Sequence, residues 1–183
     1  YSHSINHKRI ASRIFKQLCK NWKESYYGID LSTVPISPLS GITGLLYIME
    51  RFPDFYNRST YTSVINEVKR LIPTTTQYDY MSGLAGLILL VVQCKFMGGD
   101  DKQAILKECA ERIRQLATTK KDVTYWTYTD GNKITGEKQM VLGGFAHGSS
   151  SMALAMFQLA KHLKDRRYYN MFCQSLLHDR SFY

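Results

Sequence analysis

The chain has 183 residues, of which 44% are hydrophobic and 13% aromatic, a composition typical of one globular domain with its own core. Its 24 Lys and Arg against 15 Asp and Glu give a formal charge of +9, which favours an acidic partner. The charge is spread out and no base-reading motif accompanies it, so we expect no nucleic-acid binding. The longest apolar run, 83–92, is too short for a membrane span, and no secretory leader is evident, so we predict a cytoplasmic protein.

Apolar residues at three- and four-residue spacing predict helices through most of the chain, over 8–23, 41–52, 61–72, 83–97, 102–117, 149–163 and 167–178. In the first helix the Lys and Arg side chains form the solvated polar side of an amphipathic pattern whose apolar side carries Ile10, Ile14, Leu18 and Trp22. The fold class predicted by this periodicity is all-α.

Two local pairs are predicted within the helix over 102–117. Asp100 and Gln103 have the spacing of a capping pair at its start. Glu108 and Arg112 lie one turn apart with opposite charges, which favours a contact along the helix surface.

The exception to the helical pattern is the segment 123–135, VTYWTYTDGNKIT. Its β-branched and aromatic residues flank Asp130 and Gly131, which predicts a small β-hairpin with its turn at this dipeptide. The following residues lack the sixth-position glycine and the spaced acidic ligands of a calcium loop, so no calcium site is predicted.

Three of the predicted helices begin with related sequences, SPLSGITGLLYIMERF, YDYMSGLAGLILLVVQC and GGFAHGSSSMALAMFQLAKH. Small residues three positions apart mark these starts: Gly41 and Gly44, Gly83 and Gly86, Gly148 and Ser151. The intervals between them leave room for a second helix, which predicts repeated helical hairpins. Because small residues allow close backbone approach, we expect a curved α/α array whose three inner helix starts face one cavity.

Two residues at these helix starts are candidates for chemistry. Asp79 lies four residues before Gly83, and His147 lies one residue before Gly148. A carboxylate can orient an imidazole and stabilise its charged form, while the ring exchanges protons near neutral pH. We therefore predict that Asp79 and His147 meet as a proton-transfer pair. Two structural interpretations stay open, since an aspartate before a helix is commonly an N-cap and a single histidine is commonly structural.

Other chemistries fit the glycines and serines around His147 less well. The stretch contains neither a Gly-x-Gly-x-x-Gly motif nor a Walker lysine, which argues against nucleotide binding. Its serines lack the Gly-x-Ser-x-Gly elbow of a hydrolase nucleophile.

The stretch YDYMSGLAG resembles the Asp-x-x-x-Gly-x-x-Gly motif of the LanC-like lanthionine cyclases, and GGFAHGSSS resembles their Gly-x-Ala-His-Gly-x-x-Gly motif, with Ser151 in place of the last glycine. Together with ALAMFQLAKHLKDRRYY and LLHDRSFY, the GFAHG form is most similar to the cyclase half of class II lanthipeptide synthetases, the LanM type. SPLSGITGLLYIME resembles the preceding repeat, so the similarity covers about residues 37–183.

This resemblance implies a partial α/α toroid that acts on a ribosomal precursor peptide. Cysteine thiols of that peptide would add to dehydroalanine or dehydrobutyrine and form thioether rings. By motif position, His147 matches the family's catalytic histidine and Asp79 its active-site aspartate.

The resemblance also implies a zinc ion that activates the thiol, held in the family by a cysteine and then a Cys-His pair. None of the four cysteines is followed by a histidine, and their own spacing predicts buried free thiols: Cys19, Cys94, Cys109 and Cys173. We expect residues 1–183 to be the first part of a LanC-like cyclase domain, an excerpt whose zinc ligands lie downstream. The kinase-like dehydratase module of a class II synthetase, with its ATP and Mg²⁺, is likewise expected elsewhere in the parent protein.

Two rival functions stay open at this point. The chain could be a non-catalytic α/α-repeat module that binds peptides, or a LanC-like protein that adds another thiol, such as glutathione, to a dehydrated residue. An α/α-toroid glycoside hydrolase is less favoured because the paired carboxylates of such enzymes are not evident.

Overall fold

The computed structural model describes residues 2–24, 29–130 and 138–181. The chain is mostly helical there, as predicted, and its α-helices are α1 (Ser2–Lys20), α2 (Gly44–Arg51), α3 (Arg58–Leu71), α4 (Leu84–Val91), α5 (Gly99–Leu116), α6 (Ser149–Leu163) and α7 (Arg166–Arg180). Two short 3-10 helices, η2 (Leu31–Thr33) and η3 (Pro53–Phe55), lie among them. None of the helices in these ranges combines the length and the apolar character needed to cross a membrane.

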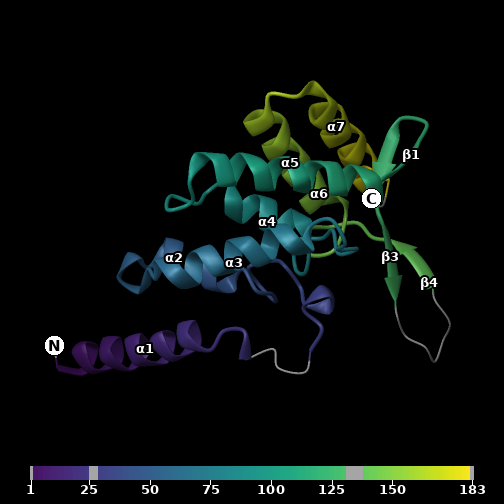
Figure 1. Cartoon of the computed structure of the whole chain (residues 1–183). Coiled ribbons are helices and arrows are strands. Elements are labelled where there is room, and N and C mark those ends of the chain that lie inside the picture. Colours follow the sequence, from purple (N-terminus) through teal and green to yellow (C-terminus); the bar gives the residue numbers. More distant parts are fainter. Residues whose placement is uncertain (1, 25–28, 131–137, 182–183) are drawn as a thin grey trace.

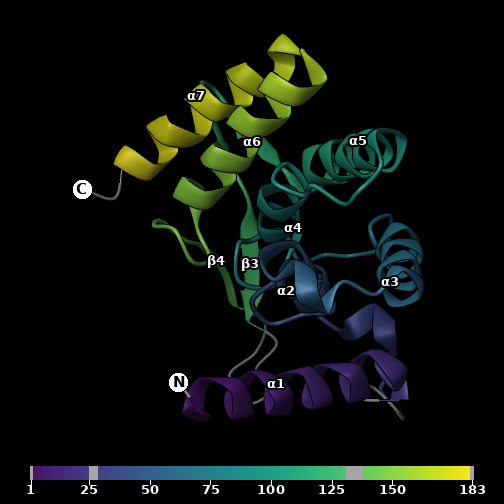
Figure 2. The same cartoon turned by 90° about the vertical axis from the view of Figure 1, so that its left-hand side faces the viewer.

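The helices follow one another in chain order along an arc, from α1 through α2 and α3, then α4 and α5, to α6 and α7 (Figure 1). Figure 2 shows α3 and α5 on the same side of α2 and α4, as an outer layer. In that layer α5 contacts both α4 and α6, while α4 and α6 also contact each other. The arrangement is the predicted succession of helical hairpins, consistent with a helical toroid.

The sequence of each helix explains its layer. The inner helix α4, LAGLILLV, is apolar all round and buries seven of its eight residues, because neighbouring helices cover several of its sides. The outer helix α3 is amphipathic and buries one stripe that includes Val64, Val68 and Leu71. Its N-terminus is capped by Asn57, whose side chain accepts a hydrogen bond from the Thr60 N–H at 2.9 Å.

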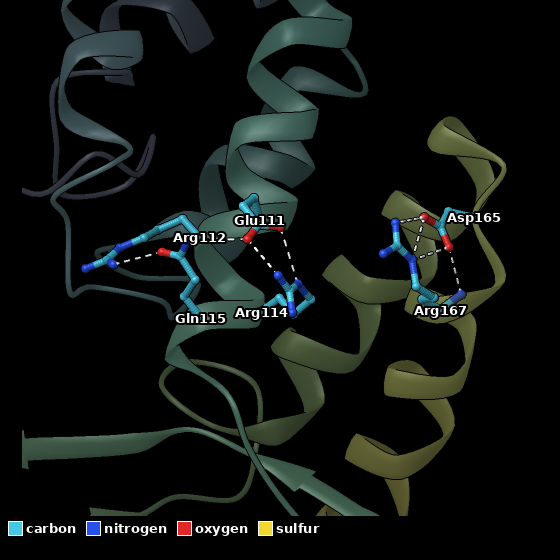
Figure 3. A network of polar contacts seen from close by, with 6 residues as sticks. All are labelled: Glu111, Arg112, Arg114, Gln115, Asp165 and Arg167. Carbon is cyan, nitrogen blue, oxygen red and sulfur yellow. Dashed lines mark hydrogen bonds and ion pairs between the residues drawn. The ribbon is translucent and has the colours of Figure 1, made fainter.

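Neither predicted pair on α5 is formed as expected. The helix begins at Gly99 with Gly98 as N-cap, so the predicted capping pair of Asp100 and Gln103 is wrong; Asp100 lies in the first turn, where a negative charge suits the helix dipole. Arg112 does not extend along the helix toward Glu108: its guanidinium donates to Gln115 at 3.2 Å (Figure 3) and to the Thr75 carbonyl at 2.8 Å. The second contact ties α5 to the segment before α4.

A small β-hairpin is present as predicted, but only two of the four described strands, β2 (Val123–Tyr125) and β3 (Thr127–Asp130), lie within the predicted segment 123–135, and each pairs with a strand outside it. The strands form two antiparallel pairs. Strand β2 pairs with the preceding strand β1 (Thr118–Lys120), and β3 pairs with the following strand β4 (Lys138–Val141). Trp126 separates β2 from β3 because its buried indole N–H donates to the Ile113 carbonyl of α5 at 2.9 Å. Gly131 of the predicted turn lies outside the described residues.

Helix α1 presents a different face to the core than its sequence pattern predicted. Ile10, Ile14 and Leu18 are exposed, whereas Phe15 and Cys19 are buried. Trp22, just after the helix, is buried as predicted. The basic side chains are solvated as expected, and Lys8 pairs with Asp54 of η3 at 2.6 Å. Contact with η3, where Phe15 stacks on Phe55, therefore decides which side of α1 is covered.

The four cysteines are free thiols, as predicted, but only three of them are buried. Cys19, Cys94 and Cys109 lie in the core, whereas Cys173 is exposed. The prediction is wrong for Cys173 because this residue falls on the outer side of α7, whose buried residues are Tyr168 and Ser175.

Candidate functional site

The three helix starts lie in turns that share one backbone hydrogen bond, the first turn (35–44), the second turn (77–86) and the third turn (142–151). In each turn the N–H of the residue after the glycine donates to a carbonyl seven residues earlier at 3.1 Å: Ile42 to Pro35, Leu84 to Gln77, Ser149 to Leu142. A Cβ atom added to any of the three glycines would overlap the backbone of its own turn: Gly41, Gly83 and Gly148. These glycines are therefore required by close backbone approach.

The turns are also bonded to one another. The hydroxyl groups of Ser37 and Ser40 in the first turn both donate to the Met81 carbonyl of the second turn, the latter at 2.6 Å. The Met81 N–H in turn donates to the Ala146 carbonyl of the third turn at 3.2 Å. Segments far apart in the sequence thus form one continuous row.

Asp79 and His147 meet where the second and third turns join. His147 Nδ1 lies 2.9 Å from Asp79 Oδ2, although the two residues are 68 positions apart in the sequence. The predicted meeting of these side chains is confirmed. Asp79 is only 4% exposed, whereas the His147 side chain is 46% exposed, so the pair has a buried acid and an accessible ring.

The other oxygen of Asp79 explains how its carboxylate is held. Asp79 Oδ1 accepts a hydrogen bond from the Ser82 N–H at 2.6 Å. The N-cap of α4 is Gly83, so Asp79 holds the turn before the helix and is not the N-cap itself. With one oxygen bonded to its own turn, the carboxylate has a fixed direction in which to present the other oxygen to His147.

This geometry decides which imidazole nitrogen carries the proton when the ring is neutral. A carboxylate oxygen accepts, so Nδ1–H of His147 is the donor to Asp79 Oδ2. The lone pair of the neutral ring then lies on Nε2. A ring held in this tautomer can accept a proton at Nε2 while the aspartate stabilises the resulting charge.

A cavity of about 470 Å³ opens beside the pair, lined by Thr76, Gln77, Tyr78, Asp79, Ser82, Leu116, Thr127 and His147. The lining comes from the second turn and the residue before it, the third turn, the end of α5 and β3. The first turn does not contribute to it, so the prediction that all three helix starts face one cavity is met by the second and third turns alone. The first turn instead contacts the second turn through its serine hydroxyls, which donate to the Met81 carbonyl.

Two wall residues of this cavity were not anticipated from the sequence. The Tyr78 hydroxyl donates to the Trp126 carbonyl at 3.4 Å, which joins the second turn to the β segment. Gln77 Oε1 is buried and has no hydrogen-bond partner among the described residues. A buried carbonyl oxygen favours a hydrogen-bond donor, so Gln77 is a candidate to bind an N–H or O–H group of a ligand.

The described residues do not fit a zinc site. They contain no group of three or more His, Cys, Asp and Glu side chains that could hold a metal ion. Cys94 and Cys109 are buried, which raises the pKa of Cys94 to about 12 and raises that of Cys109 as well, and neither thiol belongs to such a group.

Comparison with known proteins is consistent with this arrangement. A family model described as "Lanthionine synthetase C-like protein" matches residues 1–183, which extends the resemblance beyond the predicted range of 37–183. Searches of curated proteins and of solved structures found no match.

Proposed function

We propose a function from the premise that the chain belongs to the lanthionine synthetase C-like family, whose members are generally of the cyclase type. The proposed reaction is the addition of a peptide cysteine thiol to a dehydroalanine or dehydrobutyrine residue, with formation of a thioether ring. The observation that carries the proposal is the 2.9 Å contact between Asp79 and His147, which lies beside a cavity and joins the two turns that resemble the family motifs.

The chemistry requires one proton to leave sulfur and one proton to reach carbon. The thiolate attacks the β-carbon of the dehydrated residue, so a carbon–sulfur bond forms and the carbon–carbon π bond becomes an enolate. The α-carbon of the enolate then takes up a proton, and the product has the same mass as the reactants. A group that exchanges protons near neutral pH can serve either transfer.

His147 is the proposed proton-transfer residue because its ring is accessible and fixed in one tautomer. In this assignment Nε2 exchanges the proton with substrate, and the buried carboxylate of Asp79 holds Nδ1–H and stabilises the imidazolium. Asp79 thus acts through the ring. Its burial keeps water from competing strongly for the same hydrogen bond.

The finer assignment is also part of this proposal. We infer a class II, LanM-type context in the cytoplasm, with a ribosomal precursor peptide as substrate and a dehydratase module that uses ATP and Mg²⁺ to prepare it. Zinc would supply thiol activation when bound, with ligands other than the described residues. The support for this context is the similarity of the GFAHG motif and of the sequence that follows it.

Replacement of His147 by alanine tests the proposal in the parent protein, supplied with a dehydrated precursor peptide. Loss of a general acid–base group slows catalysis by about 10²- to 10⁴-fold, and we expect ring closure to slow by this factor. Because cyclisation leaves the mass unchanged, uncyclised thiols are counted by alkylation and mass spectrometry.

The matched control is Ser40→Ala, since Ser40 occupies the place in the first turn that His147 occupies in the third. We expect this variant to cyclise at a near wild-type rate. Wild-type ring closure by a folded His147→Ala protein would leave a peptide-binding module as the better assignment. Faster consumption of glutathione than of the peptide thiol would favour the other rival function.

A further inference from the structure

Helix α7 presents a polar face to the third turn. Ser175, His178 and Asp179 are spaced by three and four positions, so they lie on the same side of the helix. The Ser175 hydroxyl donates to the Ser149 carbonyl at 3.0 Å, which fixes α7 against the start of α6.

Asp179 bridges the two sides of the segment that carries His147. Its Oδ1 accepts from the Gly144 N–H at 2.9 Å, and its Oδ2 accepts from the Ser150 hydroxyl at 2.8 Å. Gly144 lies three residues before His147 and Ser150 lies three residues after it. One carboxylate therefore closes the loop around the histidine.

The position of Asp179 in its own helix supports a role outside that helix. It lies in the last turn of α7, where the helix dipole disfavours a negative charge. The loop that it holds contains Gly144, whose φ of 82° few other residues adopt readily, and Gly148. A loop with this much backbone freedom needs external contacts to keep one conformation.

His178 completes the contact between α7 and the third turn. Its Nδ1 lies 2.7 Å from the Ser149 hydroxyl, which also lies 3.2 Å from the Leu142 carbonyl oxygen. Ser149 is only 3% exposed, which excludes it from attacking a substrate as a nucleophile. The contact between Ser149 and His178 therefore helps to hold the third turn against α7.

We propose that Asp179 is a positioning residue for His147: by holding Gly144 and Ser150 together, it keeps the imidazole at hydrogen-bond distance from Asp79. For its effect on catalysis this inference rests on the proposed function. The geometric part, that Asp179 controls the tautomer of His147 through the loop, stands independently of any activity.

The direct test is the nitrogen-15 NMR spectrum of the histidine rings in the chain. In the wild type we expect His147 to show the single tautomer with hydrogen on Nδ1. Asp179→Ala removes both loop contacts, and we expect the two ring nitrogens to shift toward the averaged values of mixed tautomers. Asp179→Asn should restore the wild-type pattern, because its amide can accept from the Gly144 N–H and donate to the Ser150 hydroxyl.

Asp165 provides the matched control on the same helix. At the opposite end of α7 its side chain accepts from the Arg167 N–H at 2.9 Å and pairs with the Arg167 guanidinium (Figure 3). Asp165→Ala should weaken the helix by loss of a cap and leave the His147 signals unchanged. An equal shift in this variant would reduce Asp179 to a general stabiliser of α7 and overturn the proposal.

A further variant, Ser150→Ala, keeps the test decisive. If Asp179→Ala fails to fold, Ser150→Ala removes one loop contact alone, and a smaller shift in the same direction is expected. His147 signals that stay at wild-type positions in folded Asp179→Ala, or in Ser150→Ala, contradict the proposal.

The catalytic part is tested by a double-mutant cycle on the parent protein, with a synthetic peptide that contains one cysteine and one dehydroalanine. We expect Asp179→Ala to lower kcat by about tenfold with little change in KM, and to have no further effect when His147 is already alanine. An equal loss in both backgrounds means that Asp179 does not act through His147. If His147→Ala alone has no effect, the proposed function fails, and the NMR result still decides the geometric inference.

Discussion

The first turn and the second turn share two backbone hydrogen bonds but carry different side chains. Each closes with a 3.1 Å hydrogen bond around a glycine that admits no side chain. Where the second turn has Asp79, the first has Ser37, four residues before the glycine. Ser37 donates to the Met81 carbonyl and is completely buried, whereas Asp79 presents an oxygen to His147. The shared backbone contacts serve the packing of the turns, whereas the chemistry depends on the side chains that each turn carries.

The third turn extends this comparison. Gly144 stands at the place of Asp79, and His147 stands at the place of Ser40. The candidate pair thus combines one position of the second turn with a different position of the third, brought together by the Met81 to Ala146 hydrogen bond. Neither turn contains the pair alone.

The largest expected effect separates Asp79 from Ser37. Asp79→Asn keeps an acceptor for the Ser82 N–H but loses the charge that orients and stabilises the His147 ring. We expect ring closure in the parent protein to slow by about 10²- to 10³-fold, measured by alkylation and mass spectrometry.

Ser37→Ala is the control for this comparison. It loses one hydrogen bond to the Met81 carbonyl, so the free energy of unfolding should fall by about 1 kcal/mol while the rate of ring closure stays near wild type. Equal losses of the ring-closure rate in Asp79→Asn and Ser37→Ala would contradict a chemical role that distinguishes Asp79 from Ser37.

The next effect is on stability, at Gly83, which occupies the same place in the second turn as Gly41 in the first. In Gly83→Ala the new Cβ would overlap the Gln77 carbonyl group, so the second turn must move, and the free energy of unfolding should fall by about 2 to 4 kcal/mol in urea titration. Gly98→Ala is the control, because nothing lies within 4 Å of an added Cβ there. Similar losses at both positions would refute the requirement for close approach in the turn.

The pH dependence of stability provides a subtler test at the third turn. Burial lowers the pKa of His178 from 6.5, and Asp179 opposes this effect. The unfolded chain then binds more protons than the native state as the pH falls toward the native pKa, so the free energy of unfolding should decrease on acidification. His178→Gln should flatten this dependence between about pH 7.5 and 5.5 in urea titrations. An unchanged slope would show that the burial of His178 does not contribute.

The last prediction compares the reactivity of two thiols and requires the smallest change to the protein. Cys173 is exposed, whereas Cys94 is buried and burial raises its pKa to about 12. Iodoacetamide should therefore label Cys173 at least about tenfold faster than Cys94 at pH 8, as read by peptide mass spectrometry, and without unfolding. Cys173→Ser is the control that removes the fast phase. Rapid labelling of Cys94 in the native protein would contradict its place in the core.

The sequence by itself determined the helices and the candidate pair. Helix formation depends on the spacing of nearby apolar residues, so α3, α4 and α6 could be predicted from local periodicity. Asp79 and His147 could be paired because both stand at the starts of repeated units, and repetition places equivalent starts side by side.

Tertiary structure alone decided the features that depend on distant partners. Trp126 binds Ile113 of α5 and thereby divides the β segment into two pairs, and η3 selects which side of α1 is covered. Likewise, Asp179 has no neighbour in the sequence that reveals its role, because Gly144 and Ser150 reach it only after α7 folds back onto α6. Such contacts arise from the packing of complete elements, which local sequence patterns do not encode.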